Sequence, residues 1–440
     1  MDNDKQLNRQ EREAYWMPFT PNQQFKDQPR MIVGAKGMYY TLEDGRTLLD
    51  GISGLWCCNA GHGRHEITQA ISKTAANLDY SPAFQMAHPM AFELANRLKA
   101  LAPEHLDYVF FSNSGSEAVD TALKMARAYW HKKGEKNRLK IISREKGYHG
   151  VNIGGTSVSG IEANRQNFGP GIDVEYLSHT LLRENAFTRG LPNIGAEKAH
   201  ELETMIQQYG PSTIAAVIVE PFAGSAGVIL PPQGYLHNLR KICDHYNILL
   251  IFDEVISGFG RLGSAFASQE WAVTPDIITC AKGLTNGTIP MGAVIAHKHI
   301  YEAFMQGPEH SIEFPHGYTY SAHPVACAAA LATLDIYQQD KLFQRSKIMS
   351  PYFENAVHQL QRCNNVIDIR NYGLVAAVEL KPRSGAAGKR ARDTFLKCYQ
   401  TGALVRFTGD TLALAPPLII KESEIDKLIN ILGEAIDSSA

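Results

Sequence analysis

Short runs of β-branched and aromatic residues recur along the chain, and each ends near a polar or charged residue. This pattern predicts strands that are covered on both faces. Between them lie amphipathic segments, among them residues 117–133 and 235–246, in which apolar side chains recur at helical spacing. Strands that alternate with helices predict an α/β fold with a largely parallel sheet between helices. The predicted strands of this sheet are residues 108–112, 139–143, 214–220, 248–253, 277–280 and 292–296.

The end of the chain predicts a second, smaller layer. Residues 366–370 and 375–380 have strand patterns, and the basic, glycine-containing residues 381–392 are predicted to form a solvent-exposed loop. Ser423 is predicted to cap a final helix, whose apolar face consists of Ile425, Leu428, Ile429, Leu432 and Ile436. Because 440 residues exceed the usual size of one hydrophobic core, we expect more than one domain.

Composition and charge exclude several classes of protein. The chain is 44% hydrophobic and 20% charged, with a formal net charge of −2, which favours neither nucleic acid nor an acidic membrane surface as a partner. No apolar stretch approaches the length of a membrane span, and residues 1–13 lack the apolar centre of a signal peptide. The seven cysteines are scattered and odd in number, so we expect a reducing, cytoplasmic setting.

Two of the predicted strands lead to groups of opposite charge. One strand ends at Asp253, and another is followed by Lys282. In open parallel sheets, ligands bind beyond the C-terminal ends of the strands. An amine and a carboxylate at that edge suit pyridoxal phosphate, because the amine forms a Schiff base and the acid keeps the ring nitrogen protonated. On these two residues alone, a salt bridge within the fold is the alternative interpretation.

Other strand ends carry motifs that suit the same kind of ligand. Residues 113–118 (Asn-Ser-Gly-Ser-Glu-Ala) begin a predicted helix with free N–H groups, which favour a phosphate, although a plain helix cap has the same pattern. Tyr148 is an aromatic residue able to stack on a flat ring, and His149 is either a base or a hydrogen-bonded support. Glu220 is either a ligand contact or a loop cap. The histidines of residues 61–65 lack further metal ligands, so we expect a turn and no metal site.

Five motifs follow one another in a recognisable set: residues 113–118, 147–150 (Gly-Tyr-His-Gly), 253–255 (Asp-Glu-Val), 257–261 (Ser-Gly-Phe-Gly-Arg) and 281–283 (Ala-Lys-Gly). Together they resemble the class III aminotransferases, a fold-type-I family that uses pyridoxal phosphate. The likeness extends from the N-terminal region to the last helix. Further stretches resemble one subgroup, the ω-amino acid:pyruvate or β-alanine:pyruvate aminotransferases, namely residues 53–56, 78–82, 316–324 and 405–407.

The resemblance implies an architecture and an assembly. Residues 66–330 would form a large domain that binds pyridoxal phosphate on a mostly parallel sheet of the seven-stranded type. A smaller α/β domain would come from both termini. Residues 1–65 would contribute to it and to the active site, and residues 331–440 would form its C-terminal part. The family also implies a homodimer with shared active sites, with a tetramer as a further possibility.

The resemblance also implies a role for each matched residue. Lys282 would be the Schiff-base lysine and Asp253 the partner of the ring nitrogen, which makes these two the catalytic pair. Tyr148 would stack on the ring, with Val255 on its other face, and Thr319 would reach the phosphate across the dimer interface. The remaining cofactor-binding residues would be Ser114, Gly115, Ser116 and Glu220.

For the substrate, the resemblance implies that Arg406 binds a carboxylate and that Trp56 contacts the substrate. The implied walls of the pocket are Phe19, Leu55, Phe84 and Ala413. Ala413 stands where relatives of the β-alanine type can have a glutamine, and this leaves the preference between ω-amino acids and plain amines open.

The expected reaction is transfer of the amino group of an ω-amino acid or primary amine to pyruvate. It would give the oxo product and alanine by a ping-pong mechanism through Lys282. One alternative is a relative acting on 4-aminobutyrate, ornithine or a diamine with pyruvate or 2-oxoglutarate, or an aminomutase or decarboxylase. Another is a binding protein that keeps the fold without turnover, and the intact Lys282 and Asp253 argue against it.

Overall fold

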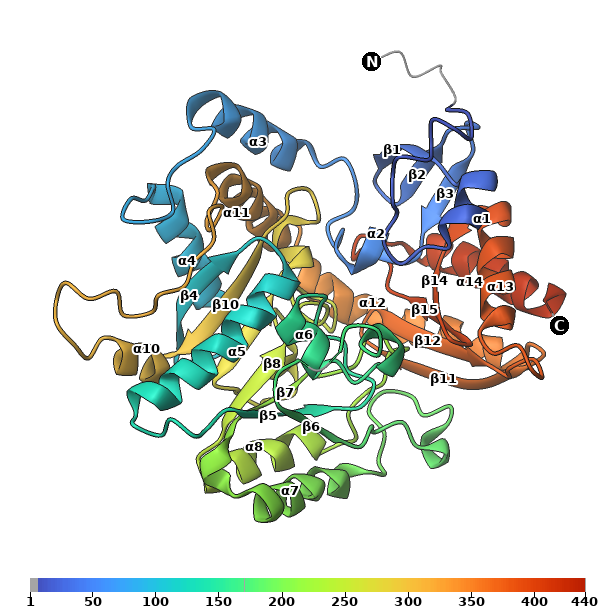
Figure 1. The fold of residues 1–440 in the computed structure, drawn as a ribbon. Coiled ribbons are helices and arrows are strands. Elements are labelled where there is room, and N and C mark those ends of the chain that lie inside the picture. The colour runs from blue at the N-terminus through green and yellow to red at the C-terminus, as the bar shows by residue number, and fades with distance from the viewer. Residues whose placement is uncertain (1–6, 170, 440) are drawn as a thin grey trace.

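A computed structural model describes residues 7–169 and 171–439, with three sheets and the helices around them (Figure 1). The central sheet has seven strands in the order β4-β10-β9-β8-β7-β5-β6. Only β10 is antiparallel to its neighbours, so the predicted α/β fold with a mostly parallel, seven-stranded sheet is confirmed. The strands are β4 (Leu106–Ser112), β5 (Lys140–Arg144), β6 (Val174–Leu177), β7 (Ile214–Val219), β8 (Leu249–Asp253), β9 (Ile277–Cys280) and β10 (Gly292–His297).

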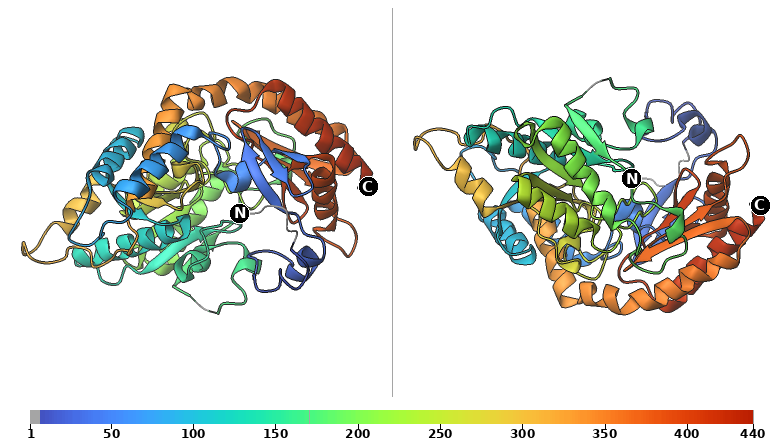
Figure 2. Two further views of the ribbon diagram at one scale, coloured as in Figure 1. Left: turned by 90° about the horizontal axis from the view of Figure 1, so that it is seen from above. Right: turned by 90° about the horizontal axis from the view of Figure 1, so that it is seen from below.

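The middle strands of this sheet are apolar because both of their faces are covered. All residues of β7, β8 and β9 are buried. Along β7, Val217 and Val219 belong to one core cluster, whereas Ala216 and Ile218 belong to another. This alternation follows from the pleat, since successive side chains of a strand point to opposite faces. Helix α5 lies over one face and α8 over the other (Figure 2).

The helices around the central sheet include the two helices that the hydrophobic pattern predicts, at residues 117–133 and 235–246. Their bounds are α3 (His65–Asn77), α4 (Pro89–Leu101), α5 (Gly115–Lys132), α6 (Ile153–Val158), α7 (Glu201–Tyr209), α8 (Tyr235–Tyr246), α9 (Ala267–Glu270), α10 (Lys298–Phe304) and α11 (Pro324–Gln339). Short 3-10 turns occur at η1 (Glu162–Asn164), η2 (Arg183–Asn185), η3 (Ala196–His200), η4 (Pro211–Thr213), η5 (Lys282–Thr285) and η6 (Gln359–Arg362). None of the helices in the described part of the chain has both the length and the apolar character of a membrane span.

The two smaller sheets bring the ends of the chain together. Strand β3 from the N-terminal part pairs with β13 from the C-terminal part, and in Figure 1 β1–β3 lie beside α13 and α14. One sheet consists of β1 (Ile32–Lys36), β2 (Tyr39–Leu42), β3 (Thr47–Asp50) and β13 (Ala403–Leu404). The other consists of β11 (Val366–Tyr372), β12 (Val375–Leu380), β15 (Thr411–Leu414) and β14 (Arg406–Thr408). The remaining helices are α1 (Asn22–Asp27), α2 (Ser53–Trp56), α12 (Leu342–His358), α13 (Lys389–Thr401) and α14 (Glu422–Ser438). Domain boundaries near residues 65 and 330 stay a prediction.

Two predictions for the end of the chain are wrong in detail. Helix α14 begins one residue before Ser423, which therefore does not cap it. The start is set instead by Glu424, whose carboxylate accepts a hydrogen bond from the N–H of Lys421 at 3.0 Å. Residues 389–392 of the predicted loop lie in the first turn of α13. That helix follows Gly388, whose left-handed φ of 78° redirects the chain into the helix.

Candidate functional site

The C-terminal ends of six parallel strands, β4 to β9, lie at one edge of the central sheet, and the candidate residues follow several of them. Strands β8 and β9 are neighbours, with Asp253 in register with Thr279. Lys282 comes three residues further along the chain, and the charge of Asp253 acts on its amine. The structure thus brings together the two residues predicted as the catalytic pair.

Asp253 is buried and surrounded by hydrogen-bond donors. One carboxylate oxygen accepts from the hydroxyl of Thr279 and from the N–H of Val255, each at 3.2 Å. The other accepts from Nδ1 of His149 at 2.8 Å. These bonds fix the orientation of the carboxylate. On the opposite side of the imidazole, Nε2 of His149 is buried and has no partner among the described residues.

Lys282 occupies a special backbone position at the start of the 3-10 turn η5. Its φ is 48°, in the left-handed region that a non-glycine residue rarely adopts. Burial lowers the pKa of its amine, while the charges of Asp253 and Glu220 partly counteract that effect. A lowered pKa increases the fraction of neutral amine near pH 7, and the neutral form is the one that attacks a carbonyl carbon.

Glu220 and Tyr148 lie beside this pair. Glu220 follows β7, and its carboxylate accepts from the N–H of Tyr148 at 2.8 Å and from the N–H of Gly224 at 3.1 Å. Burial raises the pKa of Glu220 to about 7. Burial likewise raises the pKa of the Tyr148 phenol, so its ring stays neutral. Glu220 therefore acts as a cap for the 148 and 224 loops, one of the two roles expected for it.

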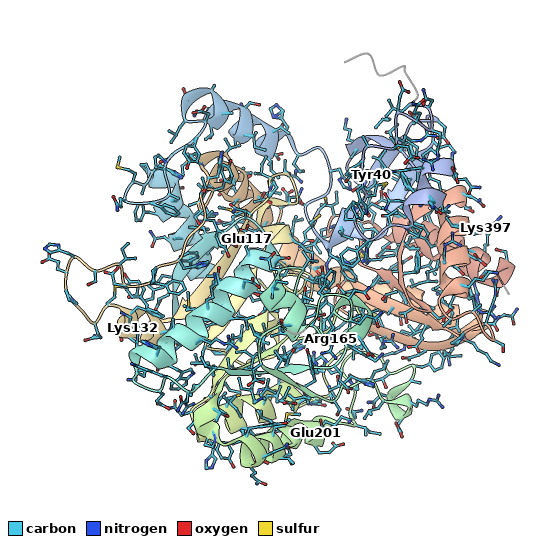
Figure 3. All side chains as sticks on the ribbon, viewed as in Figure 1. Tyr40, Glu117, Lys132, Arg165, Glu201 and Lys397 are labelled. Atoms are coloured by element: carbon cyan, nitrogen blue, oxygen red, sulfur yellow. The ribbon has the colours of Figure 1, made fainter. Side chains whose placement is uncertain are left out.

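The start of α5 forms a third side of the site. Ser114 caps the helix, because its hydroxyl accepts from the N–H of Glu117 at 3.1 Å. The hydroxyl of Ser116 accepts from the N–H of Val151 at 3.1 Å and so ties the 148–151 loop to the helix. Glu117 and Lys132, labelled in Figure 3, lie near the two ends of this helix.

Gly115 creates space at the helix start. A Cβ atom at this position would lie 3.0 Å from both Cγ atoms of Val255, which follows β8. The first turn of the helix thus approaches the end of the neighbouring strand closely. Its free N–H groups and the positive end of its dipole suit a phosphate.

Arg406 approaches the site from the small antiparallel sheet. Its charge acts on both Lys282 and Tyr148, and burial lowers the pKa of its guanidinium. Within the described residues it forms no ion pair, and its Nε is buried without a partner. Its cross-strand partner is Ala413, which is buried and lies on the same face of the sheet. A guanidinium that lacks a protein carboxylate is available for the carboxylate of a ligand.

The other predicted substrate and cofactor contacts differ in exposure. Trp56 is buried, and its indole N–H has no hydrogen-bond partner in the described part of the chain. In contrast, Phe19, Leu55 and Phe84 are exposed, by 73%, 54% and 60%. Thr319 is also exposed, and its backbone oxygen accepts from the Tyr80 hydroxyl at 3.0 Å.

Sequence reasoning undervalued two neighbours of Asp253. It left His149 undecided, whereas the structure places Nδ1 against the carboxylate. It did not single out Thr279, although this residue is the one hydroxyl in the apolar strand 277–280 and ends up opposite Asp253. A polar residue inside a run that is otherwise fully buried is the signal that would have revealed it.

The groups at this edge of the sheet match the parts of pyridoxal phosphate. A carboxylate held by hydrogen bonds (Asp253) suits a protonated ring nitrogen, an amine with a lowered pKa (Lys282) suits the aldehyde, and a helix start with a missing Cβ (Gly115) suits the phosphate. The unpartnered Nε2 of His149 is a further donor or acceptor for a group bound there.

Comparisons with known proteins agree with this geometry. Residues 22–436 match the family model described as aminotransferase class-III. The chain is 52% identical over 430 residues to a β-alanine–pyruvate aminotransferase of Pseudomonas aeruginosa, covering 97% of this chain and 96% of that one. An (S)-enantioselective ω-transaminase from Thermomicrobium roseum superimposes with a TM-score of 0.91 at 35% identity, over 99% of this chain and 100% of that one. An ω-transaminase of Pseudomonas jessenii in complex with PMP also gives a TM-score of 0.91, at 31% identity and over 99% and 98% of the two chains. This protein therefore belongs to the class III aminotransferase family.

Proposed function

We propose that the protein is a pyridoxal-phosphate-dependent ω-amino acid:pyruvate aminotransferase. The name of the Pseudomonas aeruginosa relative gives β-alanine and pyruvate as its substrates, and the likeness to it covers nearly the whole of both chains. The observation that carries the proposal is Arg406, a partly buried guanidinium without a protein carboxylate, whose charge acts on the amine of Lys282. A substrate with a carboxylate at one end and an amine at the other would engage both groups.

Each residue of the site then has a chemical task. When bound, pyridoxal phosphate supplies a ring that accepts the electrons left on the donor carbon. Lys282 would hold the cofactor through its amine, and the same amine would hold or move the proton of the donor carbon. Asp253, oriented by the hydrogen bond from Nδ1 of His149, would keep the ring nitrogen protonated. The start of α5 would bind the phosphate, and Tyr148 would cover one face of the ring.

A panel of donors and acceptors tests this proposal. β-Alanine, 4-aminobutyrate, ornithine, putrescine and an arylalkyl amine would each be offered with pyruvate and with 2-oxoglutarate. We expect the highest kcat/KM for β-alanine with pyruvate. A marked preference for putrescine or for 2-oxoglutarate would instead support the alternative of a class III transaminase with another donor or acceptor.

We further propose a homodimer with shared active sites. The N-terminal region and the 80–86 and 312–320 segments expose large apolar side chains that a monomer would leave in water, and burying them favours association. They are Tyr15, Trp16, Phe19, Tyr80, Phe84, Met86, Ile312 and Tyr320. Thr319 lies in one of these segments and would reach the phosphate of the other subunit's site. Size-exclusion chromatography with light scattering would measure the mass, and a monomer at micromolar concentration would contradict this assembly.

We assign the protein to a reducing compartment, the cytoplasm. All seven cysteines are free, and five of them are buried among apolar residues. Cysteines of this kind behave as small apolar side chains.

A further inference from the structure

The turn that carries Leu55 and Trp56 has an unusual backbone. Ser53, Gly54 and Trp56 have φ angles of 50°, 67° and 66°, all in the left-handed region. Two of these three residues are not glycine, and such conformations persist only where the surrounding structure holds them. The shape of this turn determines where its side chains point, so the groups that hold it also shape the pocket that they line.

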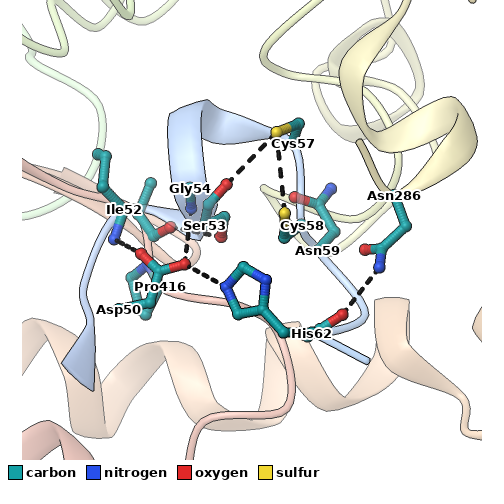
Figure 4. Close-up of polar contacts among 12 residues, drawn as sticks. Asp50, Ile52, Ser53, Gly54, Cys57, Cys58, Asn59, His62, Asn286 and Pro416 are labelled. Atoms are coloured by element: carbon teal, nitrogen blue, oxygen red, sulfur yellow. Dashed lines mark hydrogen bonds and ion pairs between the residues drawn. The ribbon is translucent and has the colours of Figure 1, made fainter. Parts of the chain in front are cut away.

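The carboxylate of Asp50 holds the turn through hydrogen bonds to its backbone. Asp50 is fully buried at the end of β3, and its Oδ1 accepts from the N–H of Ile52 at 2.9 Å. Its Oδ2 accepts from the N–H of Gly54 at 2.6 Å and from Nε2 of His62 at 2.8 Å (Figure 4). Three donors therefore converge on a single side chain, and two of them are backbone groups of the segment leading into the turn.

His62 is itself fixed in place. Its backbone exchanges two hydrogen bonds with Gly37, at 2.8 and 2.9 Å. Its ring lies against that of Tyr40, with 4.3 Å between the ring centroids. His62 therefore anchors the Asp50 carboxylate to the N-terminal sheet, far along the chain from Lys282.

A second set of contacts ties the same turn to the lysine segment. Arg261 is fully buried and donates to the Ser53 hydroxyl at 2.9 Å and to the Asn59 side chain at 2.7 Å. The N–H of Ala60 donates to the side chain of Asn286, which ends the 3-10 turn that starts at Lys282, at 2.8 Å. These contacts fix the position of the turn relative to Lys282. Asp50 determines the shape of the turn itself.

We propose that Asp50 is a positioning residue for donor recognition. Its carboxylate holds the turn of residues 53–56, with its left-handed φ angles at Ser53, Gly54 and Trp56, in the shape that presents Leu55 and Trp56 to the substrate. This inference rests on the proposed function, because it assigns to that site the residue that sets the pocket wall. Asp50 itself touches neither substrate nor cofactor.

The test is the Asp50→Asn variant, which retains the size of the side chain but replaces one of the two oxygens that accept from these three donors by an NH2 group. We expect KM for β-alanine and for an arylalkyl amine to change unequally, by about tenfold for the more affected donor, as for one lost hydrogen bond to a charged group. The absorbance of the bound cofactor and its retention on dialysis should match those of the wild type. In the protein without cofactor, hydrogen–deuterium exchange should increase in the 52–60 segment and not in that of Lys282.

Two further variants separate positioning from general stability. Gly54→Ala disturbs the turn directly, since a Cβ there would lie 2.8 Å from the Tyr40 hydroxyl oxygen, and the double variant with Asp50→Asn should be less than additive in KM. Asp276→Asn is the matched control. Asp276 also accepts a backbone N–H, that of Leu250 at 2.7 Å, and pairs with Arg240, but it lies just before β9, at the opposite end of the strands. The Asp276→Asn variant should lower the melting temperature without changing the preference between the two amine donors.

The outcomes are distinct. If Asp50→Asn lowers the melting temperature as Asp276→Asn does and affects both donors equally, Asp50 is merely structural and the inference is wrong. If exchange in the 52–60 segment is unchanged, the carboxylate does not hold the turn and the inference is also wrong. A wild-type protein that transaminates neither donor would instead overturn the proposed function, and with it this inference.

Discussion

The buried carboxyl group of Glu220 makes the stability of the protein depend on pH. Burial raises its pKa from 4.5 to about 7, so the folded state holds this proton more tightly than the unfolded chain does. Its stabilising contribution is complete below pH 4.5 and is lost as pH rises through about 7. At about 1.4 kcal/mol per pKa unit, the loss amounts to roughly 3 kcal/mol.

We therefore predict that Glu220→Gln changes the pH profile of the cofactor-free protein. The free energy of unfolding, measured with urea between pH 5 and 8, should decrease with pH more steeply in the wild type than in the variant. Parallel profiles for the two proteins would mean that Glu220 titrates as an ordinary exposed carboxyl group.

Arg406 permits a prediction about substrate classes. Arg406→Ala should lower kcat/KM for β-alanine by about 30-fold or more, because charged hydrogen bonds worth about 2 kcal/mol are lost. An arylalkyl amine has no carboxylate and should lose much less. Arg406→Lys should recover only part of the β-alanine activity, since an ammonium cannot form the two parallel bonds of a guanidinium. Equal losses for both donors would show that Arg406 has a structural role.

At the scale of elements, the close approach of α5 to the end of β8 is the feature that shapes the phosphate end of the site. Gly115→Ala would place a Cβ 3.0 Å from both Cγ atoms of Val255, and the helix start has to shift to accommodate it. We expect the affinity for pyridoxal phosphate to decrease by about tenfold, as for a loss of about 1.4 kcal/mol. Titration of the cofactor-free protein, followed by absorbance, measures this change.

Gly134→Ala is the control for that experiment, because it alters the other end of the same helix. Gly134 has a φ of 83° and open space around its Cα, so alanine there costs stability through the backbone alone. Its cofactor affinity should equal that of the wild type. If both variants weaken cofactor binding to the same extent, the effect of Gly115→Ala is a loss of helix stability.

The elements that could be predicted from the sequence are the strands that are buried on both faces of the sheet. Strands β7, β8 and β9 are continuous apolar runs. The hydrophobic pattern alone therefore places Glu220, Asp253 and Lys282 at or just beyond the ends of these strands. Strand β6 escaped notice because it lies at the edge of the sheet, and three of its four residues are only half-buried. Its short, partly polar sequence does not differ from that of a loop.

Contacts between distant segments were beyond the reach of the sequence pattern. The pairing of β3 with β13 joins residues near 50 to residues near 403, and no local periodicity encodes it. The Asp50–His62 bond depends on the left-handed turn between them, for which only Gly54 is a visible sign. The roles of Trp56 and Arg406 came from the resemblance to a family and stay proposals.

At the scale of the whole molecule, the proposed dimer predicts that two inactive variants regain activity when they assemble into a mixed dimer. Lys282→Ala lacks the amine, and Thr319→Ala lacks the hydroxyl that would reach into the other subunit's site. In a mixed dimer, one site combines Lys282 from one chain with Thr319 from the other and is complete. Co-expressed variants should therefore show more activity than the sum of the separate variants, up to half the wild-type value per mixed dimer.

Purification of the co-expressed pair through a tag carried by only one variant provides the control, since recovery of the untagged variant shows whether the subunits assemble into mixed dimers at all. If mixed dimers form and the pair of variants shows no recovery, Thr319 serves the site of its own chain. The shared-site proposal would then be wrong, while the dimer itself would stand.

The central claim is that Lys282 makes this chain an aminotransferase for an ω-amino acid and pyruvate. The most direct measurement is the initial rate of alanine formation from β-alanine and pyruvate, with pyridoxal phosphate present, by the wild type and by Lys282→Ala. We predict turnover by the wild type with parallel double-reciprocal lines, as expected for ping-pong kinetics, and none by a variant that remains folded. Absence of alanine formation by the wild type, or an undiminished rate in Lys282→Ala, would contradict the account.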